Sequence, residues 1–95
     1  MSITWSAEAR ESLLNILTYY EESVNEDFAD SIEDRITKQV DALNGFEMSI
    51  PKSDILPGTR KLVISKLPYV AFIRELQSFS WEVVDIVHTS RKLPK

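Results

Sequence analysis

Apolar side chains recur at helical spacing through the first part of the chain. Between residues 7 and 24 they fall at offsets of 4, 7, 8, 11 and 15, which places them on one face of an α-helix. The residues on this face are Ala9, Leu13, Ile16, Leu17, Tyr20 and Val24. Ser6 is the expected N-cap of this helix, and Glu8 lies in its first turn, where the helix dipole favours an acidic side chain.

The same spacing continues after Asn25, which is a second N-cap candidate. The apolar positions of this second helix are Phe28, Ile32, Ile36, Val40 and Leu43. Gly45 follows where a left-handed residue commonly ends a helix. Because almost nothing separates the two helices, we expect an antiparallel hairpin with the acidic residues on its outer faces.

Residues 45–59 form a connector in which Pro57-Gly58 predicts a type II turn. This connector is apolar enough to pack on the core, and long ordered loops are often functional. Beyond it the apolar period changes to two, which predicts strands at about 60–65, 69–76 and 81–89. Residues 3–5 predict a short strand at the sheet edge. The expected fold is α+β, with the order β-α-α-β-β-β and a helical hairpin on a C-terminal antiparallel meander.

Length and composition exclude several classes of protein. A chain of 95 residues forms one domain, expected to span 1–95. It has no cysteine and one histidine, so we expect neither a disulfide nor a metal site, and no cofactor. Its two glycines are too far apart for a phosphate-binding loop. No apolar run is long enough to span a bilayer and the N-terminus does not resemble a signal peptide, so we expect a cytoplasmic protein.

The net charge of −4 is unevenly distributed. Residues 1–44 carry ten acidic and three basic side chains, whereas residues 45–95 carry five acidic and eight basic ones. Phosphate neutralisation by Lys and Arg supplies most non-specific affinity for nucleic acids, so we expect no direct nucleic-acid binding. The positive bias of the second half still permits an acidic partner to bind there.

The candidate functional side chains lie in the C-terminal half. They are Arg60, Lys61, Arg74, Glu75, His88, Arg91 and Lys92. If the strands pair as a meander, several of them meet on one face or at one end of the sheet. Each also has a structural interpretation: Arg74 is an exposed alternate strand position, His88 is a hydrogen-bonded residue at a strand end, and Arg91 is a tail charge.

Several segments, taken in order, resemble a known family. They are Trp5-Ser6-Ala7-Glu8-Ala9, then Pro57-Gly58-Thr59-Arg60, then Leu67-Pro68-Tyr69-Val70-Ala71-Phe72-Ile73-Arg74, and finally Val84-Asp85-Ile86-Val87-His88-Thr89-Ser90-Arg91. Over nearly its whole length the chain resembles the RelE/ParE superfamily of bacterial toxins from type II toxin–antitoxin systems. Within it the chain is most similar to the ParE-type, plasmid-stabilisation branch.

The resemblance implies one of two activities. RelE-like members are ribosome-dependent endoribonucleases that cut mRNA with a basic cluster and, commonly, a C-terminal tyrosine. ParE-like members lack that cluster and inhibit DNA gyrase by binding it. Here no tyrosine follows His88, and the acidic balance disfavours docking on ribosomal RNA. We therefore expect a gyrase-binding toxin rather than an enzyme.

Two alternatives stay open. One is a ribonuclease using Arg60, Arg74, His88 and Arg91, with Glu47 or Glu75 available for proton transfer. The other is a non-toxic relative that retains only antitoxin binding.

The resemblance also implies a ParD-like antitoxin partner and a hetero-oligomeric complex. The expected antitoxin contacts are apolar residues of the helices and the connector: Leu13, Leu14, Phe46, Met48 and Ile50. The expected target-binding residues are Arg60, Arg74, His88, Arg91 and Lys92. Because the helices are strongly acidic, charge complementarity favours an antitoxin with basic side chains.

Overall fold

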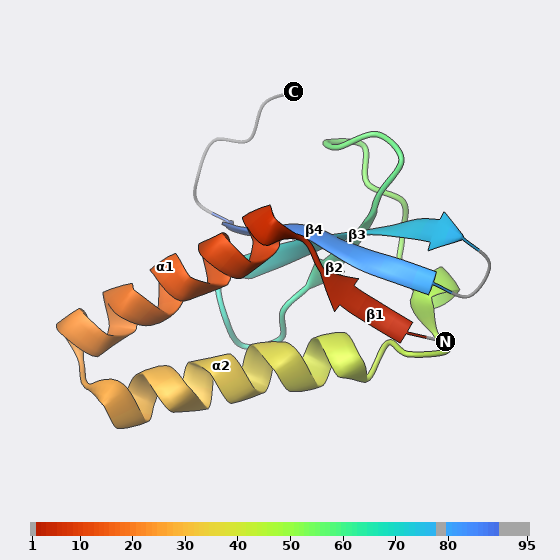
Figure 1. Cartoon of the computed structure of the whole chain (residues 1–95). Coiled ribbons are helices and arrows are strands. Elements are labelled where there is room, and N and C mark those ends of the chain that lie inside the picture. The colour runs from red at the N-terminus through yellow and green to blue at the C-terminus, as the bar shows by residue number, and fades with distance from the viewer. Residues whose placement is uncertain (1, 78–79, 90–95) are drawn as a thin grey trace.

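In the computed structural model, two helices cover one face of a four-stranded sheet (Figure 1). The structure describes residues 2–77 and 80–89, excepting the side chains of Ser2 and Glu47. The elements are β1 (Ser2–Trp5), α1 (Ala7–Ser23), α2 (Glu26–Asp41), the 3-10 helix η1 (Glu47–Ser49), β2 (Arg60–Val63), β3 (Tyr69–Gln77) and β4 (Ser80–His88). This order confirms the expected α+β fold. No helix in the described ranges is both long and apolar enough to cross a membrane.

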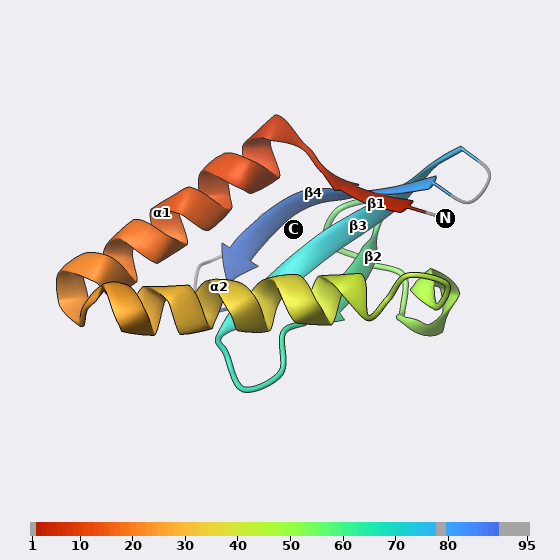
Figure 2. The same ribbon diagram turned by 60° about the horizontal axis from the view of Figure 1, so that its bottom comes forward.

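Both predicted helix starts are confirmed by their capping hydrogen bonds. The Ala9 N–H donates to Ser6 Oγ at 3.0 Å, and the Phe28 N–H donates to Asn25 Oδ1 at 2.7 Å. These side chains satisfy backbone donors that have no partner within the helix. Only Val24 and Asn25 separate the helices, which diverge from this connection as the two views show (Figures 1 and 2).

The strand order in the sheet is β1-β4-β3-β2. The pairs β2–β3 and β3–β4 are antiparallel, which confirms the predicted meander, and β1 lies at the edge as expected. Because β1 pairs in parallel with β4, the sheet as a whole is mixed. Ser6 extends this pairing: its N–H donates to the Val83 carbonyl at 3.0 Å and its hydroxyl donates to the Val84 carbonyl at 2.8 Å.

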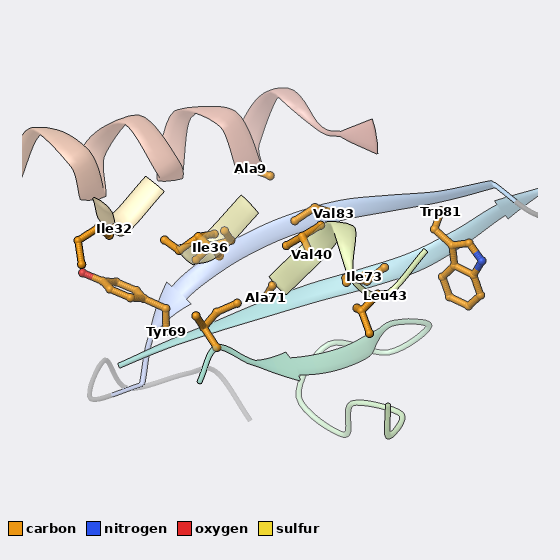
Figure 3. Packing of buried hydrophobic residues seen from close by; sticks show 12 residues of the cluster. Ala9, Ile32, Ile36, Val40, Leu43, Tyr69, Ala71, Ile73, Trp81 and Val83 are labelled. Atoms are coloured by element: carbon orange, nitrogen blue, oxygen red, sulfur yellow. The ribbon is translucent and has the colours of Figure 1, made fainter. Parts of the chain in front are cut away.

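The core lies between α2 and the sheet face toward the helices (Figure 3). Ile32, Ile36 and Val40 recur at four-residue spacing on α2 and are at most 2% exposed. They face a layer of strand residues: Tyr69, Ala71, Ile73, Trp81 and Val83. Ile86 of β4 belongs to the same cluster. Burying one apolar side chain of this size contributes about 1.5–3 kcal/mol, so this layer is the main source of stability.

Part of the connector lies on the other face of the sheet, away from α2 (Figure 1). Residues 51–53 run beside the start of β2, with an isolated bridge between Lys52 and Arg60. Leu56 reaches the side of the sheet that carries Arg74 and Glu82. Val70 and Phe72, which point to this side, are also buried. Gly58 has a φ of +81°, which confirms the left-handed residue expected after Pro57.

The first strand of the meander is shorter than the predicted range of 60–65. The Gln39 side chain of α2 accepts a hydrogen bond from the Ser65 N–H at 2.6 Å and donates to the Ser65 carbonyl at 3.3 Å. Lys66 then adopts a positive φ of 66°. The Ile64 N–H still donates to the Tyr69 carbonyl at 2.9 Å, and at the next residue the helix amide takes the place of a strand partner.

Truncating the centre of this core should be far more costly than truncating an exposed leucine. We expect Ile36→Ala to lower the free energy of unfolding by about 2–5 kcal/mol, because the cavity left in a closely packed core cannot collapse fully. Leu14→Ala on α1 is the control, since Leu14 is 63% exposed and should cost under about 1 kcal/mol. Urea titrations of both variants measure the difference, and equal costs would contradict this account of the core.

Candidate functional site

Arg60 is a structural anchor for the connector. Its Nη1 donates to the Ile50 carbonyl at 2.7 Å, and its side chain is half-buried. Arg60 is paired with Ile73, so both side chains lie on the sheet face that carries the core. The guanidinium therefore links the start of β2 to Ile50 in the connector.

Arg74 lies on the opposite face of the sheet and forms an ion pair with Glu82. Its Nη2 and Nε lie 2.9 and 3.0 Å from the same carboxylate oxygen of Glu82. The side chain of Arg74 is 52% exposed, so the pair contributes at most about 1 kcal/mol to stability. The ion pair does, however, partly neutralise the charge of Arg74, which the sequence analysis expected to bind the target.

His88 ends β4 at the other end of the sheet. It is paired with Tyr69, and their rings pack edge to face with centroids 5.3 Å apart. The register places His88 four residues along β3 from the pair formed by Arg60 and Ile73, which is roughly 13 Å. The half-buried imidazole lies on the helix-facing side of the sheet.

The predicted convergence of these residues is therefore wrong for the three that the structure describes. Arg60 and Arg74 lie on opposite faces, and His88 lies at the opposite end of the strands. Glu75 is exposed and paired with Trp81, which lies seven residues along β4 from His88. Arg91 and Lys92 lie outside the described residues, as does the side chain of Glu47.

The residues predicted to contact an antitoxin fall into two groups. Leu14, Phe46 and Met48 are 63%, 67% and 69% exposed, which leaves their apolar surfaces available to a partner. Leu13 and Ile50 are half-buried and pack against the core cluster, so they mainly support the fold. Phe46 and Met48 follow α2 directly, at the end of that helix away from the hairpin connection.

Sequence reasoning missed a groove beside His88, which we call the β4-end groove. It has a volume of about 640 Å³ and lies between α1 and the end of β4. Its lining includes Ile16, Tyr19, Tyr20, Tyr69, Ile86 and His88. The signal in the sequence was the Tyr19-Tyr20 pair, of which only Tyr20 fits the apolar helical face.

The floor of the β4-end groove is fixed by hydrogen bonds between α1 and the sheet. The Tyr69 hydroxyl donates to the Tyr20 hydroxyl at 3.3 Å, and the Ser12 hydroxyl donates to Asp85 Oδ1 at 2.6 Å. Desolvation by burial, together with the hydrogen bond to Tyr20, raises the pKa of the Tyr69 hydroxyl above its ordinary value. Tyr69 therefore remains a neutral hydrogen-bond donor at physiological pH.

In the described part of the chain, no three side chains of His, Asp or Glu are grouped closely enough to hold a metal ion.

Comparison with known proteins identifies the family. A chain of a structure described as the chromosomal ParDE toxin–antitoxin system from P. aeruginosa shares this fold, with a TM-score of 0.85. It is 23% identical, and the alignment covers 95% of this chain and 97% of that one. Residues 3–93 match the family described as the ParE toxin of the type II toxin–antitoxin system parDE. The chain belongs to this ParE toxin family. No curated protein matches the sequence.

Because Tyr69 is buried, the stability of the protein should decrease as the pH rises in the alkaline range. A raised pKa in the folded state means that the stabilisation is complete below the unfolded-state value of about 10 and is lost as pH rises above it. Between about pH 9.5 and 11, we expect the free energy of unfolding of the wild type to fall more steeply than that of Tyr69→Phe. The reason is that the Tyr69 hydroxyl ionises in the unfolded chain with a pKa of about 10 but stays protonated in the folded one. Urea titrations across this range measure both slopes, and identical slopes would refute the assignment.

Proposed function

We propose that this chain is a toxin that is neutralised by a small ParD-like antitoxin and that acts by binding DNA gyrase. Membership of the ParE toxin family supports the toxin role, and the match to a chain from a ParDE system supports an antitoxin partner in a hetero-oligomer. The observation that carries the binding mechanism is the separation of Arg60, Arg74 and His88. Phosphoryl-transfer chemistry needs a base, an acid and a charge-stabilising group within contact of one reacting centre, and these three residues do not provide such a centre.

Induction in a bacterial host distinguishes binding from RNA cleavage. After tightly controlled expression, we expect incorporation of labelled amino acids to continue for the first minutes while cells filament and later lose viability. An immediate stop in incorporation would instead indicate an mRNA endoribonuclease. A supercoiling assay with purified gyrase from the same host provides the direct readout, and an unaffected supercoiling rate would contradict gyrase as the target.

A double variant tests whether the sheet residues perform chemistry. We expect His88→Ala combined with Arg74→Ala to weaken inhibition of gyrase partially, because removal of contact residues lowers affinity gradually. Catalytic residues would behave differently, since their removal lowers a cleavage rate by orders of magnitude. Ribosome-dependent cleavage that is present in the wild type and abolished in the double variant would overturn the binding mechanism.

The C-terminal tail is the second part of the proposed target surface. We expect deletion of residues 91–95, which include Arg91 and Lys92, to abolish toxicity while the thermal unfolding midpoint and antitoxin binding stay unchanged. Growth assays, circular dichroism and a pull-down with the antitoxin measure the three properties. Full toxicity of the truncated protein would contradict this placement.

The exposed pair Phe46 and Met48 is the proposed centre of the antitoxin contact. We expect Phe46→Ser with Met48→Ser to weaken binding of the antitoxin encoded beside this toxin by at least about thirtyfold, since burying two large apolar side chains contributes several kcal/mol. Val63→Ser on β2 is the matched control, because Val63 is 58% exposed and lies in the sheet. Calorimetric titration measures both variants, and an unchanged affinity of the double variant would remove these residues from the interface.

A further inference from the structure

The loop of residues 64–68, which joins β2 to β3, is fixed in place by hydrogen bonds from two directions. From α2, the Gln39 amide bonds both backbone groups of Ser65, at 2.6 and 3.3 Å. From the end of β4, the Thr89 N–H donates to the Pro68 carbonyl at 2.8 Å. The loop is therefore bonded to both a helix and a neighbouring strand, and it lies beside α2 (Figure 2).

Lys66 has an unfavourable backbone conformation in this loop. In the part of the chain that the structure describes, it is the only residue other than glycine with a positive φ, at 66°. This conformation is unfavourable for a residue with a side chain, because Cβ comes too close to a carbonyl oxygen, and glycine avoids that contact. The Lys66 side chain is exposed, so burial does not offset the strain. Stability alone favours glycine at this position, which points to a role of the lysine side chain in binding.

Arg35 of α2 adds a second cation beside the loop. It lies four residues before Gln39, so the two side chains share one face of the helix. Because Gln39 reaches Ser65, this face is the one next to the loop. Arg35 and Lys66 are both exposed, and within the described residues neither forms an ion pair. We call these two residues the basic pair.

The basic pair is continuous with the proposed target surface. Pro68 bonds Thr89, which directly follows His88. Arg91 comes two residues later, a reach of at most about 7 Å along the chain. A target protein that contacts His88 and Arg91 therefore lies next to the loop that carries Lys66.

The antitoxin is a poor fit to these charges. The acidic helices favour an antitoxin with basic side chains, and the basic pair would repel such side chains. The proposed antitoxin contacts, Phe46 and Met48, are followed by Ile50, which Arg60 bonds at the start of β2. The loop that carries Lys66 instead follows the other end of that strand.

We propose that Lys66 and Arg35 bind an acidic segment of the toxin's target protein. Asp or Glu side chains of that segment lie against the two cations, and the neighbouring Arg91 contacts the same partner. Because hydrogen bonds already fix the loop, placing Lys66 against a carboxylate costs little further conformational entropy of the backbone. This inference rests on the proposed function, from which it takes gyrase as the target.

The test compares two double variants that each remove two positive charges. Arg35→Gln with Lys66→Gln removes the basic pair, and Lys38→Gln with Lys52→Gln removes exposed lysines of α2 and the connector. In a gyrase supercoiling assay at low salt, we expect the first variant to raise the half-inhibitory toxin concentration about fivefold to tenfold and the control variant to leave it unchanged. The difference should shrink at high salt, because exposed charges are screened.

Substitutions of Lys66 alone separate its charge from its backbone conformation. Lys66→Gly removes both the charge and the strain, so we expect weaker inhibition with a thermal unfolding midpoint that is unchanged or raised. Lys66→Arg keeps the charge and should recover most of the inhibition that Lys66→Gln loses. Lys66→Glu should weaken inhibition further than Lys66→Gln, since a carboxylate repels an acidic partner. Equal inhibition by Lys66→Gln and Lys66→Glu would contradict an acidic partner.

The outcomes separate this inference from the proposed function. A wild type that does not inhibit gyrase would refute the proposed target, and equal growth inhibition by the two induced double variants would overturn this inference even then. If the wild type inhibits gyrase and both double variants inhibit it equally, only this inference is overturned. Loss of affinity for the antitoxin or for duplex DNA in the first variant would assign the basic pair to that ligand instead. A wild-type dimer in light scattering that the first variant dissociates would assign it to a second copy.

Discussion

Burial of the α2 stripe against β3 and β4 is the contact on which the rest of the structure depends. Ile32, Ile36 and Val40 share one helix face and lie on strand residues that are themselves nearly inaccessible. Because this contact fixes α2 across the sheet, Gln39 reaches the backbone of Ser65, just beyond the end of β2. Because the helices occupy one face, the other face is left to the connector, whose Leu56 lies beside Arg74 and Glu82, and Arg60 bonds the connector at Ile50.

The same arrangement accounts for the division of charge in the molecule. The acidic residues lie on the outer faces of α1 and α2, because the inner faces of both helices pack against the core. Two of the described cations of the sheet are engaged by local partners, Arg60 by a carbonyl group and Arg74 by a carboxylate. A ParE-family toxin built in this way offers aromatic and acidic surfaces on its helices.

Periodicity predicted the secondary structure closely because each element carries an unambiguous pattern. Ser6 and Asn25 predicted the helix starts, and Pro57-Gly58 predicted the turn. The end of β2 was predicted less accurately, because the Gln39 amide that bonds Ser65 comes from a helix 26 residues away in sequence and no local signal at Ser65 reveals it. The candidate site was predicted less well. Arg60 and Arg74 differ by 14 positions, and only the register between β2 and β3 decides that they lie on opposite faces.

The sequence by itself determined the helical hairpin, the meander, the acidic first half and the resemblance to ParE toxins, because helical and strand periods and cap residues act over a few positions. Only the tertiary structure decided the parallel pairing of β1 with β4, the separation of the predicted cations and the β4-end groove beneath Tyr19 and Tyr20. These features depend on which segments meet across long distances in the chain. The free energy of such contacts comes from packing and register, which local patterns do not encode.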